Sequence, residues 1–168
     1  KSPWKLFDIY ISSVGRNSLL LLNVPPDRRG LIHENDVKAL EGFRGILDSV
    51  FSADYEEYPT VIVKPYNNSY SPLNLVDHDP TTFWAPGRGS DTCSVILEFG
   101  EMKTFDILML RENFRNGQRV EAFTLEAESG GQWIEIAKGT TIGFKRILRC
   151  PETTAGKVRL TITAARSN

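Results

Sequence analysis

The chain is 168 residues long, has a formal net charge of −1 at pH 7, and is 40% hydrophobic and 24% charged. These values are typical of a globular protein with one domain, or with one domain and a piece of a second. There is no basic surplus to indicate nucleic-acid binding, and the longest apolar run, residues 19–22, is too short to cross a bilayer.

The first four residues, Lys1-Ser2-Pro3-Trp4, lack an initiator methionine and do not resemble a signal peptide. We therefore expect the chain to begin inside a longer polypeptide.

Two helices and a strand are predicted in the first part of the chain. Residues 6–11 have helical spacing, and the run 19–24, apolar except for Asn23, is typical of a parallel strand that is buried on both faces. The prolines and glycine of residues 25–30 predict a loop, and apolar positions with a period near 3.6 predict a helix from about Glu34 to Phe51. These elements cannot bury their apolar faces alone, so we interpret residues 1–52 as a βα unit of a larger fold.

Short β-type runs separated by turn residues follow, from about residue 53 to residue 168. Several runs alternate apolar and polar residues, which is typical of strands with one buried face. The runs are 60–63, 93–99, 105–110, 120–126, 132–137, 145–148 and 158–163. Strands at this spacing predict a sandwich or a barrel.

The two cysteines, Cys93 and Cys150, both lie in strand-like runs. We interpret them as two buried free thiols, and a disulfide between them stays open because the sequence alone does not decide it. The cysteines lack metal-site spacing, and the two histidines, His33 and His78, are far apart without other metal-type neighbours.

Residues 13–27 carry a specific pattern: Ser-Val-Gly-Arg-Asn, then an apolar run, then Asn-Val-Pro-Pro-Asp, with Gly-Leu-Ile following at 30–32. This pattern resembles the end of the catalytic barrel in glycoside hydrolase family 29, the α-L-fucosidases. It is closest to the plant-type and related bacterial α-1,3/1,4-fucosidases, and the resemblance covers about the first 50 residues.

Residues 77–86 read Asp-His-Asp-Pro-Thr-Thr-Phe-Trp-Ala-Pro, which resembles the D-G-[ND]-x-x-T-x-W pattern of discoidin-like domains. Further matches follow in order at residues 117–120, at Trp133 and at residues 141–146, so that the resemblance extends over about 110 residues. Fucosidases of the same subgroup carry such a domain at this place. Discoidin-like domains usually finish with one more strand, which here would begin near Arg166.

Together the two resemblances imply the C-terminal part of a retaining α-L-fucosidase. The implied fold is mainly β: a discoidin-like antiparallel β-sandwich of jelly-roll type (residues 53–168), preceded by the last βα unit of a (β/α)8-like barrel (residues 1–52). Retaining glycosidases use two carboxylates about 5 Å apart. In this family both come from barrel segments upstream of the last strand, so we assign no catalytic residue to this chain and no cofactor to the reaction.

The resemblance also implies partners and a location. The parent enzyme would act on a fucosylated oligosaccharide or a glycoprotein glycan, and this chain would pack against the remainder of the catalytic barrel. The expected location is extracellular or periplasmic.

Asn23 and Asp27 are candidates for positions close to the substrate, because barrel active sites form at the carboxyl ends of the strands. Asn23 would end the last barrel strand; the alternative is that it braces the loop backbone. For Asp27 the alternative is a turn residue. Glu34 and Asp36 are interpreted as residues that the helix dipole favours.

Asp77, Asp79 and Thr82 have the spacing D-x-D-x-x-T. Oxygen donors at this spacing suit a tight loop around Ca²⁺, and related carbohydrate-binding domains hold a structural calcium in this loop. The alternative is an Asx turn, in which Asp77 and Asp79 accept hydrogen bonds from local backbone amides.

Tyr66, Arg111 and Arg119 are candidates for glycan contact, whereas Trp84 is expected to face the core. The sequence shows no cluster of exposed aromatic residues of the kind that a sugar site needs. We therefore expect the sandwich to brace the barrel, with a carbohydrate-binding, lectin-like module without catalysis as the alternative.

Overall fold

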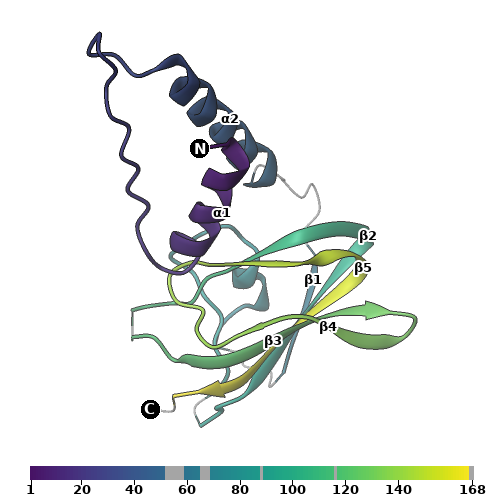
Figure 1. Cartoon of the computed structure of the whole chain (residues 1–168). Helices are drawn as coiled ribbons and strands as arrows, with labels where there is room; N and C mark the ends of the chain where they lie inside the picture. The colour runs from purple at the N-terminus through teal and green to yellow at the C-terminus, as the bar shows by residue number, and fades with distance from the viewer. Residues whose placement is uncertain (52–58, 65–68, 88, 116, 167–168) are drawn as a thin grey trace. The chain divides into compact units, whose positions relative to one another are not determined.

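The computed structural model of the chain has two compact units, a helical unit (Lys1–Asp54) and a sandwich unit (Tyr55–Asn168) (Figure 1). The residues that it describes are 1–51, 59–64, 69–87, 89–115 and 117–166. The boundary predicted between residues 52 and 53 lies outside them. No helix in the described part of the chain combines the length and the apolar character that a membrane span requires.

Helix α1 (Pro3–Ser13) begins at a side-chain cap. The Ser2 hydroxyl accepts a hydrogen bond from the backbone N–H of Lys5 at 3.3 Å, and Pro3 occupies the first turn, where its missing N–H costs no helical bond. The helix buries Leu6 and Phe7. It contains the run that the sequence predicts to be helical.

Helix α2 (Glu34–Phe51) has the bounds that the sequence predicts. Glu34 and Asp36 lie in its first turn, where negative charge complements the helix dipole. The two helices pack through aromatic rings: Tyr10 of α1 meets Phe43 of α2 edge-on, with 6.1 Å between ring centroids. This contact buries Phe43 and closes the small core of the helical unit.

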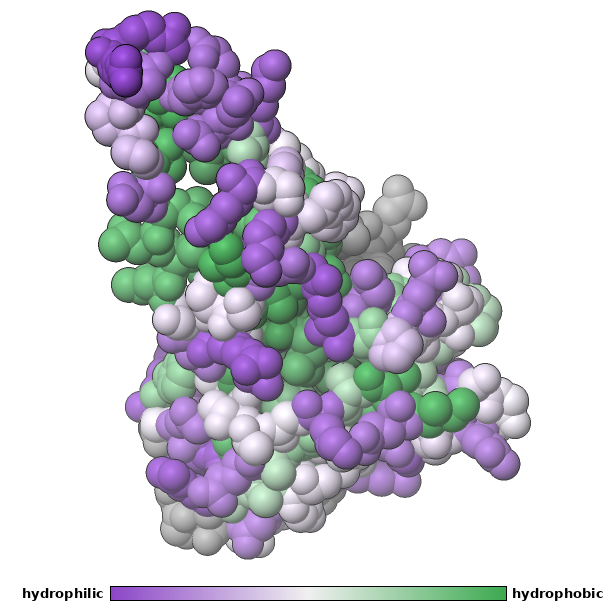
Figure 2. Space-filling view, in the orientation of Figure 1, coloured by the Kyte–Doolittle hydropathy of each residue, from purple (hydrophilic) through white to green (hydrophobic). Residues whose placement is uncertain are grey.

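The strand predicted at residues 19–24 is wrong for this structure, because the segment is extended but pairs with no strand among the described residues. Leu19 and Leu21 are 91% and 94% exposed, whereas Leu20 and Leu22 are half-buried. This is the two-residue alternation of a strand, but a strand also needs backbone hydrogen bonds to a neighbour. Figure 2 shows the apolar residues that gather on the surface of this unit.

The sandwich unit contains one five-stranded antiparallel sheet with the order β1-β2-β5-β3-β4 and a short 3-10 helix, η1. The elements are β1 (Thr60–Lys64), η1 (Pro72–Leu75), β2 (Cys93–Leu110), β3 (Val120–Ser129), β4 (Gln132–Gly139) and β5 (Arg146–Ala165). The mainly β, antiparallel fold class that the resemblance implies is therefore confirmed.

Two strands are longer than predicted and bend over (Figure 1). β2 joins the predicted runs 93–99 and 105–110, and β5 joins the runs predicted within residues 145–163. Ala155, which lies between two of the runs predicted from the sequence, is in the ladder opposite Lys103. A register shift next to this pair lets both strands bend without a turn.

A second register shift accommodates the proline of β5. Phe105 is paired with Thr153 and Ile107 with Arg149, so that the segment around Pro151 bulges out of the ladder. Proline lacks a backbone N–H and is tolerated in a strand at such a bulge. The bulge therefore explains how one strand continues through a residue that usually ends strands.

Among the described residues of the sandwich, buried side chains form two clusters. The larger one is formed by Phe123, Leu125, Ile142, Val158 and Ile162. The smaller one is formed by Val63, Trp84 and Val95, which confirms that Trp84 faces the core.

Candidate functional site

The Glu112 carboxylate holds together the loop after β2 and the loop after β4. One of its oxygens accepts the backbone N–H groups of Arg119 at 2.6 Å and Val120 at 2.9 Å. The other accepts the N–H of Gly143 at 3.1 Å, and the N–H of Glu112 itself donates to the carbonyl of Gly143 at 2.9 Å. Hydrogen bonds to a charged group are among the stronger ones in proteins, so the carboxylate fixes both loops.

We call the described residues of 111–120 and 141–145 the Glu112 corner. It carries an exposed aromatic pair: Phe114 and Phe144 stack with ring centroids 6.4 Å apart and planes at 15°, and they are 40% and 62% exposed. The expectation of no exposed aromatic cluster is therefore wrong. The two residues are far apart in the sequence, and the bonds of Glu112 hold their loops together.

The structure places two of the predicted glycan-contact residues in this corner. Arg111 is exposed, and Arg119 is half-buried, with its carbonyl accepting the backbone N–H of Arg166 at 2.9 Å. The third, Tyr66, lies outside the described residues. Glu112, which lies next to Arg111 in the sequence, is bound to backbone amides.

The candidate calcium residues form a hydrogen-bonded turn. Asp77 accepts the backbone N–H of Asp79 at 3.0 Å and the hydroxyl of Thr82 at 2.7 Å. Asp79 accepts the backbone N–H and the hydroxyl of Thr81, at 2.8 and 2.6 Å. These are the bonds of an Asx turn.

The electrostatic surroundings of this turn bear on calcium binding. The bonds from Thr81, together with the positive charge of Arg115, hold the pKa of Asp79 below its ordinary value. Within the described part of the chain, no three or more His, Cys, Asp and Glu residues are arranged to hold a metal ion. Calcium prefers six to eight oxygen ligands, so the described residues do not by themselves fit it, and the hydrogen bonds of the turn favour the Asx-turn alternative.

Asp27 lies in a turn with Arg29 in front of α2. Its carboxylate accepts the backbone N–H of Arg29 at 2.8 Å and two guanidinium N–H groups of the same residue, and Arg29 also donates to Glu34 at 2.6 Å. The Arg29 Nη2 atom is 2.6 Å from an oxygen of each carboxylate, so these two oxygens lie no more than twice that distance apart.

This upper limit does not by itself exclude a retaining glycosidase pair, but the chemistry does. Such an enzyme needs one carboxyl group with a raised pKa to act as the acid. Here the hydrogen bonds from Arg29 are the first cause that lowers the pKa of both Asp27 and Glu34. Both groups therefore stay ionised at neutral pH, and the pair cannot act as an acid.

Asn23 lies along a hollow of about 310 Å³ in the helical unit. Leu6, Leu21, Leu22 and Asp36 are also part of its lining. Asn23 is exposed at the end of the extended segment, which agrees with a position at the edge of a larger site but does not test it.

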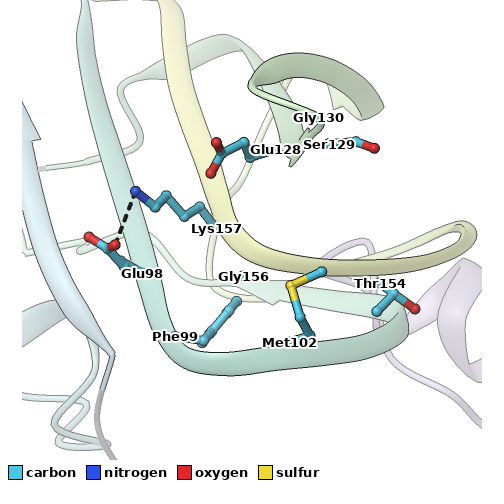
Figure 3. Close-up of a pocket in the computed structure, with 9 residues that line it drawn as sticks. All are labelled: Glu98, Phe99, Met102, Glu128, Ser129, Gly130, Thr154, Gly156 and Lys157. Carbon is cyan, nitrogen blue, oxygen red and sulfur yellow. Dashed lines mark ion pairs between the residues drawn. The ribbon is translucent and has the colours of Figure 1, made fainter.

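A second hollow, of about 330 Å³, lies in the sandwich unit (Figure 3). Its charged groups satisfy one another, because Lys157 donates to Glu98 at 3.0 Å and also lies in the field of Glu128. The Met102 side chain lies beside them and is 63% exposed. A ligand in this hollow would therefore meet charged groups that already neutralise each other.

Comparisons with known proteins give two kinds of similarity. Residues 56–168 match the sequence profile of a family described as F5/8 type C domain. Alpha-L-fucosidase 1 of Arabidopsis thaliana is 38% identical over 155 residues, which cover 89% of this chain and 31% of that protein.

Solved structures show similarity over both units. SpGH29 is 34% identical with a TM-score of 0.91, over 99% of this chain and 37% of that one. A GH29 fucosidase of Ruminococcus gnavus in complex with fucose is 30% identical with a TM-score of 0.90, over 99% of this chain and 34% of that one. The chain thus spans about a third of the length of these relatives and corresponds to their C-terminal part.

Proposed function

The chain belongs to the F5/8 type C domain family, and from this premise we propose that it is the C-terminal part of a retaining α-L-fucosidase. The observation that carries the proposal is the extent of the similarity. The family profile begins at residue 56, whereas the match to SpGH29 covers 99% of the chain and therefore includes the helical unit. A type C domain found outside fucosidases has no reason to share that unit.

The proposed reaction is hydrolysis of α-L-fucosyl linkages in oligosaccharides or glycoprotein glycans. The R. gnavus relative is in complex with fucose, which supports this class of substrate. The two catalytic carboxylates would lie in the part of the parent polypeptide that this chain does not include. This assignment agrees with the lowered pKa values of Asp27 and Glu34, because a carboxyl group with a lowered pKa is not suited to act as the acid.

The extended segment supports a place in a barrel. Residues 19–24 alternate exposed and half-buried side chains, as a strand does before it pairs with neighbours. In the parent enzyme this segment would become the last barrel strand and bury Leu19 and Leu21. Asn23 would then end that strand at the rim of the active site, with Asp27 in the turn beyond it.

The proposal is tested by comparing this chain with the whole parent polypeptide. The whole polypeptide is expected to hydrolyse an aryl α-L-fucoside with retention of configuration, followed by NMR of the first-formed sugar. The 168-residue chain is expected to give no turnover above background. Robust turnover by the chain alone, or inversion by the whole polypeptide, would refute the proposal.

The sandwich itself is proposed to brace the barrel. The alternative, a lectin-like module, predicts that the 168-residue chain binds fucosylated oligosaccharides saturably in a calorimetric titration. Loss of such binding in Arg111→Ala would then assign the sugar site. The proposed extracellular or periplasmic location is tested by fractionation of cells that express the whole polypeptide.

A further inference from the structure

We propose that the Phe114–Phe144 pair of the Glu112 corner is the surface by which the sandwich docks on the remainder of the parent polypeptide. This inference rests on the proposed function and deepens it, because it names the contact through which the sandwich braces the enzyme.

The pair is built to be rigid and yet exposed. Each phenylalanine lies on its own loop, and the bonds from Glu112 to Arg119, Val120 and Gly143 fix the two loops relative to each other. Two stacked rings that are 40% and 62% exposed present an apolar surface that is already ordered before binding. Pre-ordered aromatic side chains lower the entropy cost of association and are enriched where interfaces gain their energy.

The charges around the pair indicate what it contacts. Arg111 and Arg115 are exposed in the same corner, and Arg119 is half-buried there. Glu112 is the one acidic residue in the described part of the corner, and both of its oxygens are occupied by backbone amides. The charged groups that the corner offers beside the rings are therefore cationic, and its counterpart should have an apolar centre with an acidic rim.

A polypeptide surface matches this chemistry better than a sugar does. Sugar hydroxyls both donate and accept, so a sugar site needs acceptors beside the rings, and the carboxylate closest in sequence to Phe114 is already engaged. The relatives are about three times as long as this chain, so that most of a parent polypeptide of their length lies outside it. That larger part is the occupant to which the proposal commits.

The first experiment replaces the pair in the whole polypeptide. Phe114→Ser with Phe144→Ser is compared with Met102→Ser and Ile134→Ser, two apolar residues outside the corner that are 63% and 52% exposed. The pair variant is expected to inactivate on heating about tenfold faster, with kcat/KM at 25 °C within about twofold of the parent. Inactivation no faster than in the controls would overturn the proposal.

A charge reversal tests the rim independently. Arg115→Glu is expected to speed inactivation and to release the sandwich sooner in limited proteolysis, whereas Lys64→Glu, at an exposed lysine on β1, should change neither. Equal behaviour of the two variants would contradict the acidic rim.

Tests on the 168-residue chain address the other occupants. Its Phe114→Ser, Phe144→Ser variant should lose much less thermal stability than the whole polypeptide does, because the rings are already 40% and 62% exposed there and the contact that is lost is mainly the one between them. Fucosylated oligosaccharide binding that is lost in Phe144→Ser would overturn the proposal in favour of a sugar site, and self-association lost in that variant would overturn it in favour of a second copy. Absence of fucosidase activity in the whole polypeptide would refute the proposed function, while proteolysis and melting would still test the docking.

Discussion

At the scale of single residues, Glu112 fixes the two loops that carry the stacked rings of Phe114 and Phe144. Its carboxylate accepts three backbone N–H groups from two loops. We expect Glu112→Ala to lower the free energy of unfolding by about 2–4 kcal/mol, because three donors lose a charged acceptor and the side chain cannot be replaced by a neighbour. Chemical denaturation of the 168-residue chain measures this loss.

The matched control is Glu121→Ala. Glu121 forms an ion pair with Arg166 at 2.9 Å, but both side chains are largely exposed. Exposed pairs contribute about 0–1 kcal/mol. A loss in Glu112→Ala that is no larger than in Glu121→Ala would mean that water replaces the carboxylate without cost.

The turn at Asp77 gives a prediction about calcium. Because Asp77 and Asp79 are bound to their own turn, a chelator is expected to leave the melting temperature unchanged. Asp77→Ala should lower it, since the amide of Asp79 and the hydroxyl of Thr82 lose their acceptor. Thermal melts with and without chelator decide the matter. A chelator-dependent drop of several degrees that disappears in Asp77→Ala would establish the ion.

At the scale of secondary-structure elements, β4 ends where it must pass close to the core. A Cβ atom on Gly139 would lie 2.6 Å from Cζ of Phe123, and Phe123 is 1% exposed and cannot move aside. Gly139→Ala is therefore expected to destabilise the sandwich by about 1–3 kcal/mol. In contrast, Gly87→Ala should be nearly neutral, because no atom lies within 4 Å of its added Cβ. Denaturation curves measure the two costs. Equal stability of the two variants would show that β4 moves away from Phe123 without cost.

The register of β2 and β5 settles the question of the disulfide. Cys93 is opposite Ile162 at one end of the ladder, whereas Cys150 follows Arg149, which pairs with Ile107 near the other end. A disulfide needs Cα atoms within about 7 Å. Both cysteines are free and partly buried, as the sequence predicts.

This arrangement predicts slow thiol chemistry. Burial raises the pKa of Cys93 to about 11, and burial is also the first cause that raises the pKa of Cys150. The reactive thiolate is therefore scarce at pH 8 and increases as the pH rises towards the pKa. Ellman's reagent should label the folded chain slowly and both thiols quickly in denaturant. Rapid labelling of two thiols in the folded chain would contradict the burial.

The sequence predicts elements whose signal is local. The apolar period and acidic first turn define α2 from Glu34 to Phe51, and the turn after Ser129 has two glycines at positive φ, Gly130 and Gly131. It misplaces the turns within β2 and β5, because Ala155 and its neighbours look like a turn and only the pairing across the sheet shows a bend. Similarly, Arg111 can be named from the sequence as a polar candidate, whereas the aromatic pair depends on loops that only folding brings together.

At the scale of the whole molecule, the leucines of the extended segment have different roles in the chain and in the proposed parent enzyme. Leu19 and Leu21 are almost fully exposed, so burial contributes almost nothing at these positions in the 168-residue chain. The sequence alone predicts a strand buried on both faces, and it cannot show that the neighbours of that strand belong to other parts of the polypeptide.

The last prediction uses this difference. Leu19→Ser with Leu21→Ser should leave the stability of the 168-residue chain within about 0.5 kcal/mol, as is usual for exposed positions. In the whole polypeptide the same change should cost about 3–6 kcal/mol, because each buried leucine contributes about 1.5–3 kcal/mol. The half-buried pair, Leu20→Ser with Leu22→Ser, is the control and should destabilise both forms. Thermal melts of the chain and heat inactivation of the whole polypeptide measure the two costs, and equal effects of the Leu19 and Leu21 variant in both forms would show that this segment does not enter a barrel.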